Sequence, residues 1–231
     1  MDDLWHGVAE AVHLLLAGDP ELYEIIARTL GVSLAATGLA MLLGVPLGYA
    51  LARGRFRGRT MLLSMVNTGM GMPPVVVGLL VWLLLTRSGP FGSLNLIYTK
   101  RAMVLAQFII ATPLVVGFTA ATIQSLPGGL SDLLHSLGAK RFHRLWIIAG
   151  EARLGLLAAI MAGFGAIISE VGASMTVGGN LRGSTRVLTT AIVTETGRGN
   201  LPVALALGLL LLALAFSVNL LLTIAQQRQR T

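Results

Sequence analysis

Three groups of residues in this sequence carry side chains suited to chemistry. The first is a glycine-rich run in which Gly178, four further residues, Gly183 and Ser184 imitate the start of a phosphate-binding P-loop. The lysine of that motif is absent and no buried strand precedes the run, so we do not expect nucleotide binding. We interpret the run as a turn in which glycine allows close backbone approach.

The second group is a carboxylate and three prolines inside apolar segments. Glu170 follows an uncharged run, where a charge is costly and usually faces protein or water. Two roles are open for it: a pore or gate residue, or a structural partner for an arginine or for backbone amides. Pro73, Pro74 and Pro113 remove backbone donors and bend helices. They either pack around kinks or belong to helices that line a translocation pathway.

The third group is Arg182, Arg186 and Arg198, whose guanidinium forks suit oxyanions. Other chemistry has little support, because the chain contains no cysteine and only four scattered histidines. Disulfides, thiolate chemistry and cysteine metal sites are therefore excluded, and a histidine metal cluster is not expected. No Ser–His–Asp set stands out either. We expect no catalytic residue, no cofactor and no metal, and thus a protein that is not an enzyme.

The composition places these residues in a membrane. Hydrophobic residues make up 55% of the 231 and charged residues 12%, and the mean hydropathy is +0.79. A soluble domain averages about 25% charged residues. The net charge of +7 is not gathered on one soluble element. Its distribution is better explained by membrane topology than by nucleic-acid binding.

Five stretches reach or approach the length of about 20 apolar residues that a membrane span needs. They are Leu30–Leu51, Thr60–Thr86, Ala102–Leu126, Leu154–Ser169 and Leu201–Ala225. We expect the fourth, which is short, to continue past Glu170. The opening apolar stretch Leu4–Ala17 reaches only about 21 Å as a helix. We expect it to lie in the membrane interface, within an outer N-terminal segment 1–21 that precedes a transmembrane domain 22–231.

The balance of charge predicts the orientation of the chain. Short loops rich in lysine and arginine stay in the cytoplasm, and four arginines crowd the first loop: Arg53, Arg55, Arg57 and Arg59. Acidic residues dominate before the first span. We therefore predict the N-terminus outside and the C-terminus inside. Six basic residues fall on the outer side and oppose this orientation: Arg87, Lys100, Arg101, Arg182, Arg186 and Arg198.

One predicted cytoplasmic loop, about 127–153, has apolar stripes at helical spacing. The first stripe is Leu130, Leu133, Leu134 and Leu137, and the second is Phe142, Leu145, Trp146 and Ala149. Gly138 lies between them, as glycine does where a helix ends. We predict two short helices around Gly138. The pattern leaves open whether they rest on lipid headgroups or present a face to a protein partner.

Several motifs resemble the membrane permeases of ABC importers, in particular their molybdate and tungstate branch. They are MPPVVVGLL (Met72–Leu80), GPFG (Gly89–Gly92), Ala106-Gln107, Thr112-Pro113 and GFGAIISEVGASMTVGGN (Gly163–Asn180). Leu181–Thr196 is more similar to tungstate-type permeases. The 127–153 loop resembles the family's EAA loop, with Asp132 in place of the opening glutamate and Gly138 six residues later. The resemblance runs from about Leu22 to the C-terminus.

This resemblance implies an all-α fold with five transmembrane helices and a cytoplasmic coupling loop. It implies the permease subunit of an ATP-driven importer of an oxyanion, tungstate first, with molybdate or a sulfate-like oxyanion as alternatives. A stand-alone secondary transporter is less favoured, since no internal repeat is visible. The implied partners are two copies of an ABC ATPase, an extracytoplasmic oxyanion-binding protein, a second copy of the permease and membrane lipid. The implied location is a bacterial or archaeal cytoplasmic (inner) membrane.

The residue patterns above, taken together with this resemblance, give two sets of candidate residues. Those for ATPase coupling are Asp132, Leu137, Gly138, Ala139 and Phe142. Those for the pore or gate are Pro73, Pro74, Thr112, Glu170, Gly178, Gly179, Asn180, Arg182 and Arg186. For Glu170 we favour the structural role, because a bare carboxylate would repel an anionic substrate. The arginines of the outer vestibule either attract the anion or bind lipid phosphate or the acidic rim of a binding protein.

Overall fold

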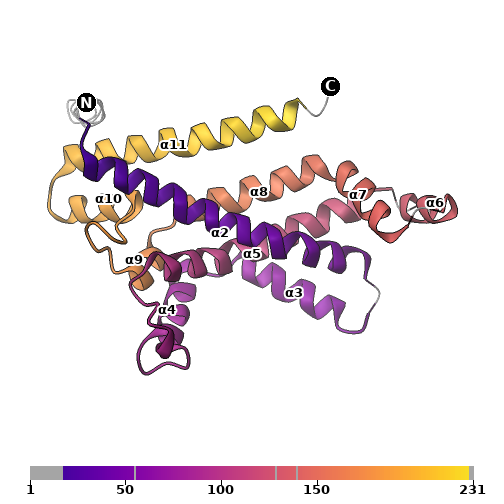
Figure 1. Cartoon of the computed structure of the whole chain (residues 1–231), viewed down its shortest axis with the longest axis horizontal. Helices are drawn as coiled ribbons and strands as arrows, with labels where there is room; N and C mark the ends of the chain where they lie inside the picture. The colour runs from indigo at the N-terminus through magenta and orange to yellow at the C-terminus, as the bar shows by residue number, and fades with distance from the viewer. Residues whose placement is uncertain (1–17, 55, 128, 139, 229–231) are drawn as a thin grey trace.

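The computed structural model describes residues 18–54, 56–127, 129–138 and 140–228, and within them the longer elements are all α-helices (Figure 1). The α-helices are α2 (Pro20–Arg53), α3 (Arg59–Met70), α4 (Pro74–Leu85), α5 (Lys100–Ser125), α6 (Leu130–Ser136), α7 (Arg141–Glu151), α8 (Arg153–Ile168), α9 (Gly172–Gly178), α10 (Leu188–Gly197) and α11 (Leu201–Gln227). A short 3-10 turn, η1, covers Gly92–Leu94. The predicted all-α class is confirmed. The stretch Leu4–Ala17 and Ala139 lie outside the described residues.

Three of the helices, α2, α5 and α11, are long and apolar enough to cross a membrane alone. Two further crossings each need a bent pair. The axes of α3 and α4 meet at 104°, and those of α7 and α8 at 70°. By length and composition the described residues thus hold three to five crossings, five if each bent pair is counted as one. The predicted fourth span, Leu154–Ser169, corresponds to α8 alone.

The stretch Thr60–Thr86 is two helices and not the single kinked span that we expected. A residue before proline disfavours the helical conformation, and two prolines in a row extend this effect over Met72 and Pro73. Pro73 is extended, with φ −61° and ψ 123°, and Pro74 is the first residue of α4. At that position the missing N–H of proline costs nothing. In contrast, Pro113 lies inside the continuous helix α5.

The fourth span also differs from our expectation, since it does not continue past Glu170 as one helix. α8 ends at Ile168 and α9 begins at Gly172. The next helix, α10, was not predicted, because its ten residues are too short for a span. The Glu170 carboxylate accepts a hydrogen bond from the N–H of Ala173 at 2.8 Å. The carbonyl of Glu170 accepts another from the hydroxyl of Thr189 at 3.0 Å.

The centre of the bundle is a close contact between α2 and α5. A Cβ atom added at Gly48 would lie 2.7 Å from the carbonyl oxygen of Val116, and one at Gly44 would lie 2.9 Å from a methyl group of Val115. Such distances require glycine. Gly38, on the same helix, has no neighbour of this kind within 4 Å. Close helix packing therefore explains Gly44 and Gly48 but not Gly38.

The two groups of candidate residues lie at opposite ends of the bundle. Figure 1 shows α9, α10 and the first turns of α2 and α11 together at one end, and α6 and α7 at the other. The long helices α2 and α5 run between these ends. A group that binds an anion at one end and a group that contacts a partner at the other would therefore be connected through packed helices.

We expect Gly48→Ala to destabilise the protein, because the added methyl group overlaps α5 and overpacking typically costs about 1–3 kcal/mol. Gly38→Ala is the matched control on the same helix. It meets open space and should be neutral or stabilising by up to about 1 kcal/mol through helix propensity. The measurement is the thermal unfolding midpoint of the purified protein in detergent. Equal midpoints for the two variants would contradict the packing role of Gly48.

Candidate anion site and coupling helices

The loop between α9 and α10 is folded by its own side chains. The hydroxyl of Thr185 donates to the carbonyl of Gly178 at 2.5 Å and accepts from the N–H of Leu181 at 2.9 Å. Three positions of the loop have positive φ: Gly179 at 69°, Asn180 at 48° and Gly183 at 72°. Glycine adopts this conformation without steric cost. The predicted glycine-rich turn is therefore observed.

The first turns of α2 hold this loop in place. Nη1 of Arg28 donates to the carbonyl of Arg186 at 2.8 Å, and the hydroxyl of Thr29 accepts from the N–H of Leu188 at 3.0 Å. The side chain of Arg28 is 5% exposed and also pairs with Glu24 at 2.7 Å. A buried arginine that donates to the backbone and to an acid has a structural role. The loop is thus fixed against α2 by a buried polar contact.

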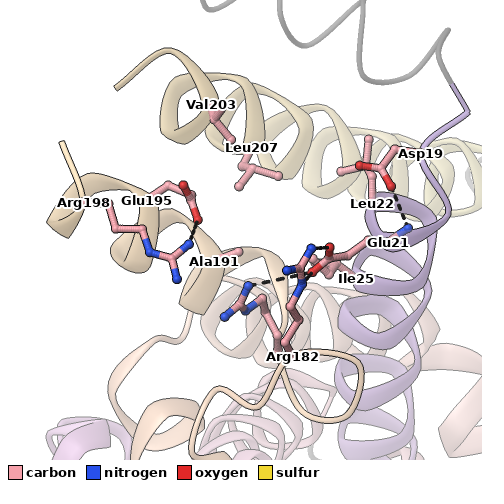
Figure 2. Close-up of a pocket in the computed structure, with 11 residues that line it drawn as sticks. Asp19, Glu21, Leu22, Ile25, Arg182, Ala191, Glu195, Arg198, Val203 and Leu207 are labelled. Atoms are coloured by element: carbon pink, nitrogen blue, oxygen red, sulfur yellow. Dashed lines mark hydrogen bonds and ion pairs between the residues drawn. The ribbon is translucent and has the colours of Figure 1, made fainter. Parts of the chain in front are cut away.

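The Glu21 carboxylate lies between two of the predicted anion-binding arginines. Nε of Arg182 donates to Oε1 of Glu21 at 2.7 Å, and Nη2 of Arg182 donates to Oε2 (Figure 2). Nη1 of Arg186 lies 3.8 Å from Oε1. The hydrogen bond with Glu21 raises the pKa of Arg182 further above its usual value. The two arginines therefore converge on one carboxylate at the N-terminal end of α2.

A cavity of ≈ 240 Å³ adjoins this cluster. Its charged lining consists of three acids and three arginines: Asp19, Glu21, Glu195, Arg182, Arg186 and Arg198. The remaining wall is apolar and comes from α2, α10 and α11, as Figure 2 shows for Leu22, Ala191 and Leu207. Arg198 pairs with Glu195 at 2.8 Å. The formal charges of the lining cancel, so the cavity as a whole is neutral.

The other predicted pore residues do not join this cavity as anion donors. The N–H of Gly179 donates to the carbonyl of Met175 at 2.9 Å, and the hydroxyl of Thr112 donates to the carbonyl of Phe108 at 2.6 Å. The side-chain amide of Asn180 donates to Thr194 at 2.6 Å. Each of these groups therefore already donates a hydrogen bond within the protein. Pro73 and Pro74 lie at the elbow between α3 and α4.

Glu170 has the backbone-amide partner that its structural interpretation requires, through the N–H of Ala173. The residue is 9% exposed. The adjoining helix α9 packs closely against α4: a Cβ atom added at Gly78 would lie 2.6 Å from the Cα atom of Ala173, and one at Gly172 would lie 2.3 Å from a methyl group of Val75. Glu170 therefore caps the start of a helix that is fitted tightly to the proline elbow.

At the opposite end, α6 and α7 form the predicted helical pair around Gly138. Gly138 has φ 75°, a conformation that β-branched residues avoid. Leu134 and Ile148 are buried, whereas Leu137 and Trp146 are 73% and 67% exposed. The pair thus buries some of its apolar side chains against the protein and leaves others exposed. The side chains of Asp132 and Phe142 lie outside the described residues.

Sequence reasoning missed three residues of these two sites. Glu21 and Arg28 were read only as charges before and near the first span, because their partners lie about 160 positions away in the chain. No local pattern shows such a pairing. Trp146 was placed in the second apolar stripe but was not selected as a contact residue. A large aromatic residue in a short amphipathic helix was the available signal.

Comparisons with known proteins agree with this architecture. Residues 44–231 match the family described as "Binding-protein-dependent transport system inner membrane component". A "Probable anion ABC transporter permease protein" of Haloferax volcanii is 42% identical over 205 residues, which are 87% of this chain and 88% of that protein. The "Tungstate uptake system permease protein TupB" of Peptoclostridium acidaminophilum is 35% identical over 98% of this chain and 100% of its own length.

A solved structure supports the fold independently. The chain matches a structure of the MetNI methionine ABC transporter in an inward-facing conformation with a TM-score of 0.74, over 92% of this chain and 99% of the other. At 15% identity this likeness shows the fold alone. Together with the family match over most of the chain, it identifies this protein as a member of the inner membrane components of binding-protein-dependent transport systems, the permease subunits of ABC importers.

Proposed function

We propose that this permease carries tungstate into the cell, with molybdate as the second candidate, through a transmembrane domain of residues 22–231. The observation that carries the proposal is the similarity to a tungstate uptake permease over nearly the whole of both chains. The arrangement of the site supports it. Guanidinium groups that suit tetrahedral oxyanions lie at one end of the bundle, and an exposed apolar face lies at the other.

The energy for transport comes from a separate ATPase, two copies of which dock on the α6–α7 pairs of two permease chains. We expect the exposed side chains of Leu137 and Trp146 to contact this partner, since exposed apolar groups that form a contiguous patch mark protein interaction sites. Packed interfaces shift between discrete arrangements. A movement of the ATPase would therefore pass through α7 into α8 as a rigid-body displacement.

An extracytoplasmic binding protein delivers the oxyanion to the opposite end. Tungstate and molybdate have nearly the same size and charge, so a transient contact with arginine would not separate them. Selection between them therefore belongs to the binding protein and not to the permease. The central test is ATP-driven uptake of tungstate into vesicles that contain the permease, its ATPase and the binding protein. Uptake that needs no ATPase would replace this proposal with a secondary transporter.

We expect the N-terminus outside and the C-terminus inside, from the arginine content of the first loop. Single cysteines at Ser93 and Ser136 test this, because both positions are exposed and the parent chain has no cysteine. In intact cells an impermeant maleimide should label the Ser93→Cys variant at once and the Ser136→Cys variant only after permeabilisation. The reverse pattern would invert the orientation.

Gly138→Val should prevent coupling to the ATPase without preventing membrane insertion. A left-handed conformation costs a residue with a Cβ atom about 1–2 kcal/mol, so the turn between α6 and α7 would be disturbed. Co-purification of the ATPase and ATP-driven uptake are the measurements. Gly129→Val is the matched control in the same loop, because Gly129 has no positive φ and no neighbour within 4 Å. Normal uptake by Gly138→Val would remove this turn from the coupling argument.

Arg182→Ala and Arg186→Ala should each slow the uptake of tungstate and of molybdate by the same factor. Both residues meet the anion only in passing, and neither can distinguish two dianions of like size. The measurement is the ratio of the two uptake rates at equal substrate concentration. A tenfold change of that ratio, about 1.4 kcal/mol, would place a selectivity site on this chain and contradict our assignment of selection to the binding protein.

A further inference from the structure

The cavity beside Glu21 is lined by a guanidinium that the described residues leave incompletely paired. The side chain of Arg186 is only 13% exposed, and its one ion pair with a described residue spans 3.8 Å. Its Nε donates to Oδ1 of Asn180 at 3.3 Å, while its Nη atoms make no hydrogen bond within the described part of the chain. A charge removed from water is costly unless it is hydrogen-bonded. The Nη atoms of Arg186 are therefore available to donate hydrogen bonds to a group in the cavity.

Glu21 occupies the position that an oxyanion would take between the two arginines. Its two oxygens accept hydrogen bonds from Nε and Nη2 of Arg182. A guanidinium group offers the same fork of two donors to a tetrahedral oxyanion. Oε1 of Glu21 is also the atom that faces Nη1 of Arg186. Two guanidinium groups from one loop thus lie against a single carboxylate of α2. Figure 2 shows the pairing of this carboxylate with Arg182.

The other acids of the cavity have different partners. Glu195 pairs with Arg198 at 2.8 Å and accepts from the side chain of Asn200 at 3.2 Å. Asp19 caps the start of α2 by accepting from the N–H of Glu21 at 2.9 Å. Among the described residues, Glu21 alone pairs with Arg182 and Arg186. Its removal would therefore leave two guanidinium groups beside the cavity without the carboxylate that balances them.

We propose that Arg182 and Arg186 form a low-affinity binding site for a free tetrahedral oxyanion, and that Glu21 sets this affinity by competing for the same guanidinium groups. The inference rests on the proposed function, because the arriving anion is the transported one. A site at an entrance must bind strongly enough to admit an ion and weakly enough to release it. The Glu21 carboxylate meets this requirement by competing with the anion for the two guanidinium groups. The anion displaces it on binding, and the carboxylate returns when the anion leaves.

The test is the binding of tungstate to the full-length permease alone, measured by isothermal titration calorimetry at low salt in nanodiscs of phosphatidylcholine. Glu21→Gln should bind tungstate at least about tenfold more tightly than the wild-type protein, a change of about 1.4 kcal/mol. Sulfate should show a similar gain, since the site recognises charge and tetrahedral shape. In Glu21→Gln combined with Arg186→Gln, the gain should disappear.

Glu24→Gln is the matched control. It removes the same charge one turn away on the same helix, but Glu24 pairs with Arg28 and does not line the cavity. Its tungstate affinity should remain within about twofold of the wild type, as expected for an exposed charge. Glu21→Asp serves as a second variant if Glu21→Gln does not fold. It keeps the charge but shortens the side chain, and should raise the affinity by a smaller factor.

Three outcomes would overturn the proposal. Glu21→Gln and Glu21→Asp could both bind tungstate no more tightly than the wild type, or the gain could survive the loss of Arg186. In the third outcome, the Glu21→Gln variant in nanodiscs of phosphatidylglycerol retains a lipid that tungstate cannot displace. The two arginines would then bind a phospholipid headgroup and not the free anion. Each of these results would leave ATP-driven import intact. Loss of ATP-driven import, in contrast, would reject the proposed function whatever Glu21 binds.

Discussion

Backbone groups inside a bilayer need hydrogen-bond partners within the protein, and this requirement decides where the helices of the permease can break. At the break between α8 and α9, Glu170 accepts hydrogen bonds from the two helices that follow. Its carboxylate accepts from the N–H of Ala173, and its carbonyl accepts from the hydroxyl of Thr189 in α10. The loop between these helices carries Arg182, and Arg28 and Thr29 hold it beside α2.

The two ends of the bundle present opposite kinds of surface. At one end arginines and acids pair with one another, and at the other Leu137 and Trp146 leave apolar groups exposed. Between them α2 packs against α5 so closely that Gly44 and Gly48 admit no side chain. Dense packing transmits displacement without much compression. The two ends, which we propose as binding surfaces, are thus joined by a closely packed pair of helices.

Local sequence patterns predicted the features that local physics determines. Hydropathy located the long helices α2, α5 and α11, and the leucine spacing around Gly138 predicted both short helices and the turn. The sequence predicted a bend at Pro73 but not the 104° angle between α3 and α4. Two adjacent prolines indicate that a helix breaks, but they do not indicate the angle of the break. The pairing of Glu21 with Arg182 joins residues 161 positions apart. Nothing in the neighbourhood of either residue indicates the other.

The pairing of Arg28 with Glu24 lies within a single helix, in contrast to the other contact of Arg28. α2 is synthesised long before residue 186, whose carbonyl later accepts a hydrogen bond from Arg28. Glu24 lies one helical turn before Arg28 and binds it at 2.7 Å, so helix formation alone supplies the counter-charge. A bare arginine near the end of a nascent span would be costly. α2 alone can thus supply a counter-charge to Arg28, independently of the loop that contains residue 186.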